Sequence, residues 1–274
     1  MTDDWQQDET RREKSTRIDT SVPNYARVGD YLRGGRSNFL ADRKAAHALI
    51  AAAPVLATIG PAVRSFHRRV VRYLTIEAGL RQFIDVGTGL AMSGNTHEIA
   101  QSVDPSCRVV YVDNDPMVLS HARALMKSAP GGATSFVDAD VCDPGAIVAG
   151  AEETLDFGKP VAVIFMATLA FVTDTAVVAD AVAIVASALP SGSHVAVNHV
   201  ASDLDPAIPL AVQRVRQWPS LHVTPRSRAE VASLVSGLDL VPPGLVPICD
   251  WRPAPDDPRF DAVVPYYGVV ARKR

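Results

Sequence analysis

The sequence predicts an α/β fold in which a mostly parallel sheet is covered by helices on both faces. Two observations lead to this prediction. From Arg81 onward, short runs rich in β-branched residues alternate with helical patterns, as is typical of parallel strands joined by helical crossovers. In addition, three Asp-Pro pairs mark helix starts, because the carboxylate can cap a helix whose first residue is the proline: Asp115-Pro116, Asp143-Pro144 and Asp205-Pro206.

Helical patterns dominate the part of the chain that precedes these strands. Residues 24–38 predict a short helix followed by a turn, and two longer helical patterns follow, at residues 43–58 and from Gly60 onward. The first 20 residues are too polar to pack into a core, so we expect a disordered or loosely docked tail.

These patterns divide the chain into three expected parts. Residues 1–20 form the tail, residues 21–79 an N-terminal helical cap, and residues 80–274 the core that contains the sheet. A single core with an added segment suits a chain of 274 residues, at about 150 residues per domain.

The core segment predicts its elements in a regular order. The expected parallel strands read QFIDVG, RVVYVD, ATSFVDAD, VAVIFMATLAFV and SHVAVNHV. Helices are expected between them, and Ser227 with Glu230 has the spacing of a capping box at a later helix start. The tail from Leu238 to Val270 has two apolar runs separated by a Pro-rich loop, which predicts an antiparallel hairpin or a pair of edge strands.

Composition and charge exclude several classes of partner. The chain has 27 Lys and Arg against 30 Asp and Glu, so its net charge of −3 provides no basic field for nucleic acid. The longest uncharged apolar run, residues 161–172, is shorter than the roughly 20 residues that a membrane-spanning helix needs. The N-terminus lacks the apolar stretch of a secretory signal, so we expect a cytoplasmic protein.

Cysteine and histidine give no metal-binding pattern. The three cysteines, Cys107, Cys142 and Cys249, have neither CxxC spacing nor the arrangement of a disulfide framework, so we expect reduced thiols in the core. His97 and Glu98 are adjacent, but one such pair does not make a metal site, and we predict no metal.

The first predicted strand runs directly into a glycine turn. Gly87 and Gly89 would let a ligand approach the backbone closely. A dinucleotide-binding fingerprint needs a third glycine where this chain has Met92, which disfavours a nicotinamide cofactor. Asp85, two residues before the first glycine, instead suits a ligand with an ammonium group, such as the methionine part of S-adenosylmethionine. The alternative is that Asp85 is an ordinary loop or capping acid.

Acidic residues also end the second and third predicted strands. Asp113 can accept two hydrogen bonds from ribose hydroxyls, and Asp140 can accept one from the exocyclic amine of adenine. Alternatively, Asp113 is a turn former and Asp140 is one of several loop acids. Three acids at successive strand ends predict a nucleoside site at the carboxyl edge of the sheet, where open α/β folds bind ligands.

Long stretches of the sequence resemble a known family. FIDVGTGLAMSGNTHEIAQ, VVYVDNDPMVLSHARALM, PNYARVGDYLRGGRSNFLADRKAA and TPRSRAEVASLVSGLDLVPPGLVP are similar to bacterial S-adenosylmethionine-dependent methyltransferases long catalogued as a domain of unknown function. The resemblance implies a class I methyltransferase, or Rossmann-like, fold. Such a fold has a seven-stranded, mostly parallel sheet with its last hairpin antiparallel, helices on both faces, and here an N-terminal helical cap. It implies no particular acceptor.

The resemblance also assigns positions in the cofactor site. It maps the first motif to Asp85, Gly87, Thr88 and Gly89, the ribose position to Asp113 and Asn114, the adenine position to Asp140 and Val141, and the wall beside the sulfonium to Met166. After the fourth strand this chain reads ATLAFVTD, where many relatives have His or Pro.

Three further residues are candidates for the site. We expect Tyr31 to fold over the cofactor and Arg64 to reach its carboxylate, although packing of the cap and a solvated helix face are the simpler roles. His199, expected just past the fifth strand, is the candidate general base, with a solvent-facing loop histidine as the alternative.

The sequence therefore predicts an S-adenosylmethionine-dependent methyltransferase with a small-molecule acceptor. A non-catalytic S-adenosylmethionine-binding regulatory protein is the first alternative, because the segment after the fourth strand lacks recognisable acceptor chemistry. An NAD-dependent oxidoreductase is the second. We expect no nucleic-acid or membrane partner, and the oligomeric state is left open, with a homodimer as one option.

Overall fold

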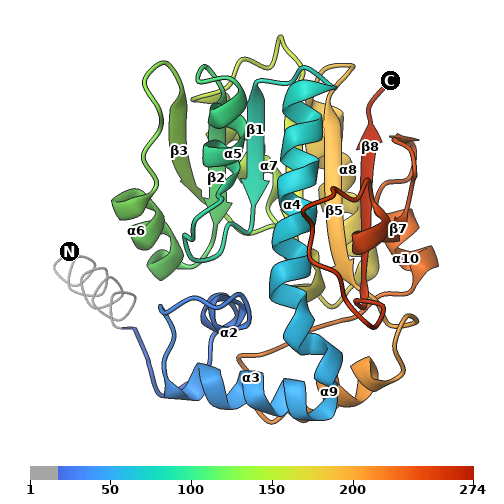
Figure 1. Ribbon diagram of the computed structural model, residues 1–274. Helices are drawn as coiled ribbons and strands as arrows, with labels where there is room; N and C mark the ends of the chain where they lie inside the picture. The colour runs from blue at the N-terminus through green and yellow to red at the C-terminus, as the bar shows by residue number, and fades with distance from the viewer. Residues whose placement is uncertain (1–17) are drawn as a thin grey trace, which may run out of the picture.

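A sheet lies between two layers of helices in the computed structural model, which describes residues 18–274 (Figure 1). The strand order is β3-β2-β1-β4-β5-β8-β6, and β7 also pairs with β8. The first five strands are mutually parallel, as predicted: β1 (Gln82–Val86), β2 (Arg108–Asp113), β3 (Ala133–Asp138), β4 (Ala162–Met166) and β5 (His194–Val200).

The last part of the chain adds the antiparallel edge of the sheet. Strand β8 (Tyr266–Arg272) runs antiparallel to β5, and two short strands, β6 (Asp239–Leu240) and β7 (Val246–Pro247), pair with β8. The expected mostly parallel sheet with an antiparallel end is confirmed, but it has eight strands in place of seven, because two short strands, β6 and β7, both pair with β8. Pro242 and Pro243 lie between them, and proline cannot donate a ladder hydrogen bond.

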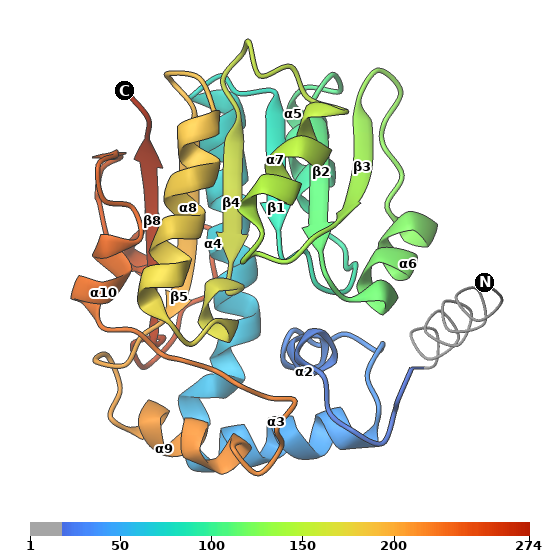
Figure 2. The ribbon, with the colours of Figure 1, turned by 180° about the vertical axis from the view of Figure 1, so that it is seen from behind.

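Helices cover both faces of this sheet. The helices on one face are α4 (Ile59–Ile76), α5 (Thr96–Val103) and α6 (Pro116–Leu125). The other face carries α7 (Pro144–Glu152), α8 (Thr175–Ala188) and α10 (Arg228–Ser233), as Figure 2 shows. The predicted caps are confirmed at Asp115, Asp143 and Ser227, whose side chains accept hydrogen bonds from first-turn amides.

A further group of helices lies beyond the carboxyl ends of the parallel strands (Figure 1). It consists of α2 (Tyr25–Leu32), α3 (Leu40–Ala52), the 3-10 helices η1 (Pro54–Thr58) and η2 (Leu169–Phe171), and α9 (Ala207–Val215). The single helix expected over residues 43–58 is thus two elements, because Pro54 cannot continue an α-helix.

Polar contacts fix α2 against its neighbours. Buried Arg27 forms an ion pair with buried Asp42 of α3, with 2.9 Å between Nε and Oδ2. Asn24, the N-cap of α2, donates from Nδ2 to Asp115 Oδ2 at 2.9 Å. Because Asp115 lies two residues after the end of β2, the bond from Asn24 places the start of α2 over the edge of the sheet.

The residues assigned to the cap occupy two places in the fold. Helices α2 and α3 lie at the carboxyl edge, whereas α4 packs Phe66, Val70 and Leu74 into the core against the sheet. The division at residues 79 and 80 stays a prediction. The tail expected over residues 1–20 lies almost wholly outside the described residues.

Two remaining sequence-based expectations concern the membrane and the cysteines. Within residues 18–274, no helix combines the length and apolar character needed to cross a bilayer.

All three cysteines are free thiols; Cys107 is buried and Cys249 is partly buried. The prediction of a core thiol is wrong for Cys142, because this residue lies in the exposed loop after β3 rather than in a strand.

Candidate functional site

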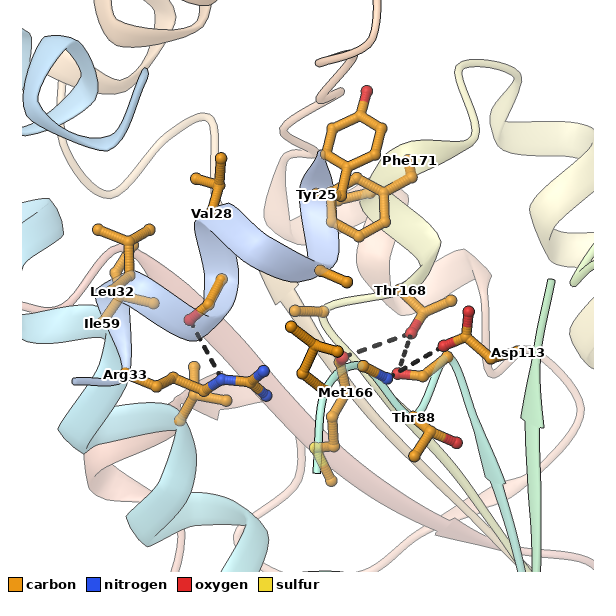
Figure 3. A pocket seen from close by; sticks show the side chains of 18 of the residues that line it. Tyr25, Val28, Leu32, Arg33, Ile59, Thr88, Asp113, Met166, Thr168 and Phe171 are labelled. Atoms are coloured by element: carbon orange, nitrogen blue, oxygen red, sulfur yellow. Dashed lines mark hydrogen bonds between the residues drawn. The ribbon is translucent and has the colours of Figure 1, made fainter. Parts of the chain in front are cut away.

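A cavity of about 520 Å³ lies between the carboxyl ends of the strands and helices α2, α3 and α9 (Figure 3). It lies where the sequence placed a ligand site. Its lining includes all the predicted cofactor residues except Tyr31: Arg64, Asp85, Gly87, Thr88, Gly89, Asp113, Asn114, Asp140, Val141 and Met166.

The turn after β1 exposes backbone at the floor of the cavity. Gly87 and Gly89 have φ values of 74° and 64°, a region that side-chain-bearing residues rarely adopt. A Cβ atom at Gly87 would also collide with the side chain of Thr168, which donates to the carbonyl of Val86 at 2.9 Å. Glycine at position 87 is therefore required both by the backbone conformation and by the close approach of the loop after β4.

Asp85 is a buried carboxyl group beside this turn. Its Oδ2 accepts a hydrogen bond of 2.5 Å from Thr96 Oγ1, which in turn lies 2.8 Å from His67 Nε2. Burial raises the pKa of Asp85 to about 6, although the Thr96 hydroxyl lowers it. Burial also lowers the pKa of His67 to about 4, with Arg33 contributing. A neutral imidazole can therefore donate to Thr96 while Thr96 donates to Asp85.

Asp113 is held firmly at the end of β2. Its Oδ2 accepts from the backbone N–H of Gly89 at 3.0 Å, and its Oδ1 accepts from the N–H of Asp115 at 3.0 Å. Burial raises the pKa of this carboxyl, and the backbone amides counteract the rise. The carboxylate retains free lone pairs and faces the cavity, so it can accept further hydrogen bonds.

Asn114 and Asp140 form a bridge between the ends of β2 and β3. Asn114 Nδ2 donates to Asp140 Oδ2 at 2.6 Å, and Cys142 N–H donates to Asp140 Oδ1 at 2.7 Å. Both side chains are exposed at the rim of the cavity. The acids of the first three strands thus line one continuous edge, as the sequence predicted.

Sequence reasoning missed Arg33, which follows the last residue of α2. Its guanidinium projects into the cavity toward the glycine turn (Figure 3), and a Cβ atom at Gly89 would lie 3.4 Å from its Nη2. Nε donates to the carbonyl of Gly29 at 3.2 Å, and no carboxylate within residues 18–274 forms an ion pair with it. Arg33 therefore offers a positive charge to a ligand. The arginine in GDYLRGG was the available sequence signal.

The structure does not place Tyr31 at the cavity. Its hydroxyl lies 2.7 Å from Nε2 of His47 on α3, and the two rings meet edge to face. Tyr25 lines the cavity instead, beside Phe171 (Figure 3). The two ring centroids are 4.1 Å apart, and the hydroxyl of Tyr25 donates to the carbonyl of His222. Tyr31 does not line the cavity, because the face of α2 that carries it packs on α3, whereas Tyr25 of the same helix does.

His199 lies inside β5 rather than beyond it, and it is fully buried. Its Nδ1 lies 2.9 Å from the carbonyl of Val200, and its Nε2 lies 2.8 Å from Nη1 of Arg226. Burial lowers the pKa of His199 to about 4. Both ring nitrogens are engaged and the residue is not part of the cavity lining, so the structure does not support its assignment as a general base.

Arg226 is the buried partner of His199. It has no carboxylate partner within 4 Å in the described part of the chain, and its guanidinium donates to Thr175 Oγ1 and to the carbonyls of Leu169 and Val172. These acceptors belong to the segment after β4, which forms one wall of the cavity. Arg226 and His199 thus hold this wall in place.

Fold and site together define the class of protein. The glycine turn after β1, the acids at the ends of the first three strands and the antiparallel β8 beside β5 are the arrangement expected of a class I methyltransferase. Within residues 18–274, no group of three or more His, Cys, Asp and Glu side chains is arranged to hold a metal ion.

Comparison with known proteins identifies the family. Residues 11–274 match the family described as S-adenosyl methyltransferase, and the chain belongs to this family. It is therefore an S-adenosylmethionine-dependent methyltransferase by family and fold.

Two crystal structures are similar to this chain over nearly its whole length. A DUF574 family protein from Streptomyces avermitilis is 38% identical, with a TM-score of 0.89, and the match covers 94% of this chain and 100% of that one. A candidate methyltransferase from Thermobifida fusca is 36% identical, with a TM-score of 0.84, and the match covers 93% and 97% of the two chains. The comparison with curated proteins gave no match.

Proposed function

We propose that this methyltransferase transfers the methyl group of S-adenosylmethionine to a small-molecule acceptor bound in the same cavity. The observation that carries the proposal is that one continuous cavity joins the predicted cofactor residues to an apolar compartment under α2, α3 and α9. Its volume of about 520 Å³ falls within the range of small-molecule sites, roughly 300 to 1,000 Å³. The net charge of −3 argues against a nucleic-acid acceptor, and we infer a cytoplasmic location from the sequence.

The residues of the polar side fit this cofactor. Asp113 has free lone pairs for the ribose hydroxyls, and Asp140 with Asn114 and Val141 forms the rim for the adenine. The turn at Gly87, Thr88 and Gly89 leaves room for the ligand at the backbone. Met166 lies beside this turn, where we place the wall next to the sulfonium.

Opposite charges on the two sides of the turn fit the amino-acid end of the cofactor. Asp85 would hold the ammonium group, whereas Arg33 and Arg64 would hold the carboxylate. Arg64 donates to the carbonyl of Ser93 at 3.2 Å and retains free donors. A zwitterionic amino-acid group thus meets a complementary charge at each of its ends.

The chain's main task in such a reaction is to align the reactants. When bound, S-adenosylmethionine would supply an electrophilic methyl group, which would pass to the accepting atom while the electron pair of the broken sulfur–carbon bond stays on sulfur. The loop after β4, held by Arg226 and Thr168, forms a fixed wall for the two reactants. The packed rings of Tyr25 and Phe171 line the cavity, where they would limit the access of water to the reactants. Where the accepting atom carries a proton, that proton would be lost to bulk water after the methyl group has been transferred.

Calorimetric titration tests this proposal directly. We expect S-adenosylmethionine and S-adenosylhomocysteine to bind at micromolar concentration, and NAD not to bind. NAD is not expected to bind because the chain lacks the third glycine of the dinucleotide fingerprint. Binding of NAD without binding of either adenosyl compound would contradict the proposal.

Replacing Asp113 with Ala is expected to weaken S-adenosylhomocysteine binding by about 1 to 3 kcal/mol, because charge-assisted hydrogen bonds to ribose are lost. The matched control is Asp138→Ala, an exposed acid at the end of the neighbouring strand that lies outside the cavity lining. Equal affinities of the Asp113→Ala variant and the unmodified protein would remove the ribose assignment.

Replacing Arg33 with Ala is expected to weaken binding of S-adenosylhomocysteine by about 1.5 to 3 kcal/mol, because a hydrogen bond to a charged carboxylate is lost. The same variant should bind adenosine, which has no carboxylate, with unchanged affinity. Arg36→Ala, an exposed arginine three residues away and outside the cavity lining, serves as the control. A parallel loss for adenosine would show that Arg33 acts by shaping the cavity and not by binding the carboxylate.

A further inference from the structure

The apolar compartment of the cavity has a distinct composition. Residues of η1, α3, α9 and the segment before α10 line it, among them Leu49, Leu56, Ile208, Ala211, Val215 and Val223. These side chains belong to two clusters that lie beyond the carboxyl edge of the sheet, whereas the cofactor residues belong to the strand ends.

Charged side chains of the cavity lie outside this compartment. Arg33 approaches Gly89, Arg64 contacts the carbonyl of Ser93, and the acids lie at the ends of β1, β2 and β3. The lining residues contributed by η1, α3, α9 and the segment before α10 all have apolar side chains: Leu49, Leu56, Ile208, Ala211, Val212, Val215, Leu221 and Val223. A charged molecule bound there would lose its hydration without gaining a counter-charge, which is strongly unfavourable.

One polar group, the hydroxyl of Tyr266, is available in this compartment. Tyr266 is the first residue of β8, pairs with Val200 of β5, and packs against the apolar cluster that contains Ala170 and Ile208. Within residues 18–274 its hydroxyl has no hydrogen-bond partner, and burial alone raises its pKa to about 12. Tyr25, the other tyrosine at the apolar side, already donates to the carbonyl of His222. The Tyr266 hydroxyl is therefore neutral near pH 7 and can both donate and accept a hydrogen bond.

We propose that the apolar compartment binds a neutral, largely apolar small molecule with a hydroxyl or carbonyl oxygen, and that Tyr266 determines specificity by hydrogen-bonding to that oxygen. Tyr266 packs against the cluster that contains Ala170, and Ala170 and Thr168 lie in the segment after β4 that lines the same cavity. A molecule held at Tyr266 therefore adjoins the wall shared with the cofactor side. This inference rests on the proposed function, because it names the acceptor class for the same cavity.

The test measures binding and requires no knowledge of the natural acceptor. The protein is first titrated with S-adenosylhomocysteine, and the saturated complex is then titrated with three probes of similar size: 2-naphthol, naphthalene and 2-naphthoate. We expect 2-naphthol to bind, and 2-naphthoate to bind at least about tenfold more weakly because its charge has no partner. Tyr266→Phe should weaken 2-naphthol by about five- to tenfold, the effect of one hydrogen bond, and leave naphthalene within about twofold.

Tyr73→Phe is the matched control, because Tyr73 is a partly buried tyrosine on α4 that does not line this cavity. It should change none of the three affinities. The inference is overturned if 2-naphthol fails to bind, if 2-naphthoate binds equally well, or if Tyr266→Phe weakens 2-naphthol and naphthalene alike. Failure of S-adenosylhomocysteine to bind in the first titration would instead contradict the proposed function, so the two failures are distinguishable.

Discussion

Asp85→Asn is expected to stabilise the ligand-free protein at pH 8 and at the same time to weaken binding of S-adenosylhomocysteine. Burial raises the pKa of Asp85 from 3.8 to about 6, so the folded chain disfavours the carboxylate. The folded state then binds its proton more tightly than the unfolded state, and the stability of the fold falls as pH rises from about 4 to about 6. Above pH 6 the fold bears the full free-energy cost of burying the charged carboxylate. The neutral amide of asparagine removes this cost, which increases the free energy of unfolding by about 1 to 3 kcal/mol.

The same substitution removes the proposed partner of the ligand's ammonium group. We expect the affinity for S-adenosylhomocysteine to fall by about 2 to 3 kcal/mol, the value of a hydrogen bond to a charged group. Asparagine retains an oxygen that can accept the Thr96 hydroxyl, so the local hydrogen bond is kept. Asp138→Asn, at an exposed strand end, is the control and should change neither quantity. Denaturant titration and calorimetry provide the two measurements.

The affinity of the unmodified protein should also depend on pH through this group. Below the pKa of about 6 the carboxyl is protonated and loses its attraction for the ammonium, so binding at pH 5 should be about tenfold weaker than at pH 8. The affinity of the Asp85→Asn variant should show no such step between pH 5 and pH 8. A step of equal size in that variant would assign the titration to another group, such as the neighbouring Asp113 or His67.

Local sequence signals predicted the elements that depend on local chemistry. The strand that runs into Gly87 and Gly89, the acids at the strand ends and the proline-marked helix starts are all readable within a few residues, because each reports a backbone or capping requirement of its own segment. The separation of β6 from β7 also has a local cause in Pro242 and Pro243, but the two short strands are too brief to give a periodic pattern.

The parts of the site that the sequence did not predict depend on packing between distant segments. Tyr31 and Arg33 are two residues apart, which places them about 200° apart around the axis of a helix, and the packing of α2 on α3 decides which of the two faces the cavity. The buried surroundings of His199 were missed because its partner, Arg226, is 27 residues further along the chain. No pattern within either segment indicates that this pair forms.

Arg226→Ala is expected to have the largest effect on stability. The guanidinium is fully buried and donates to carbonyls of Leu169 and Val172, to Thr175 Oγ1 and to His199 Nε2. Truncation leaves these buried acceptors without donors and opens a cavity, so we expect the free energy of unfolding to fall by about 3 to 5 kcal/mol in denaturant titration. Arg214→Ala, at an exposed position on α9, should change it by less than about 0.5 kcal/mol.

Arg226→Lys separates the structural roles of charge and of hydrogen bonding. Lysine keeps the positive charge but cannot reproduce the planar fork that reaches several acceptors at once, so this variant should still lose about 2 to 3 kcal/mol. Amide hydrogen exchange should then accelerate in residues 167–175, which the guanidinium holds through the carbonyls of Leu169 and Val172. If the Arg226→Lys variant kept the full free energy of unfolding and the slow amide exchange of residues 167–175, the positive charge would be sufficient to hold this wall of the cavity. The hydrogen bonds of the guanidinium would then not be required.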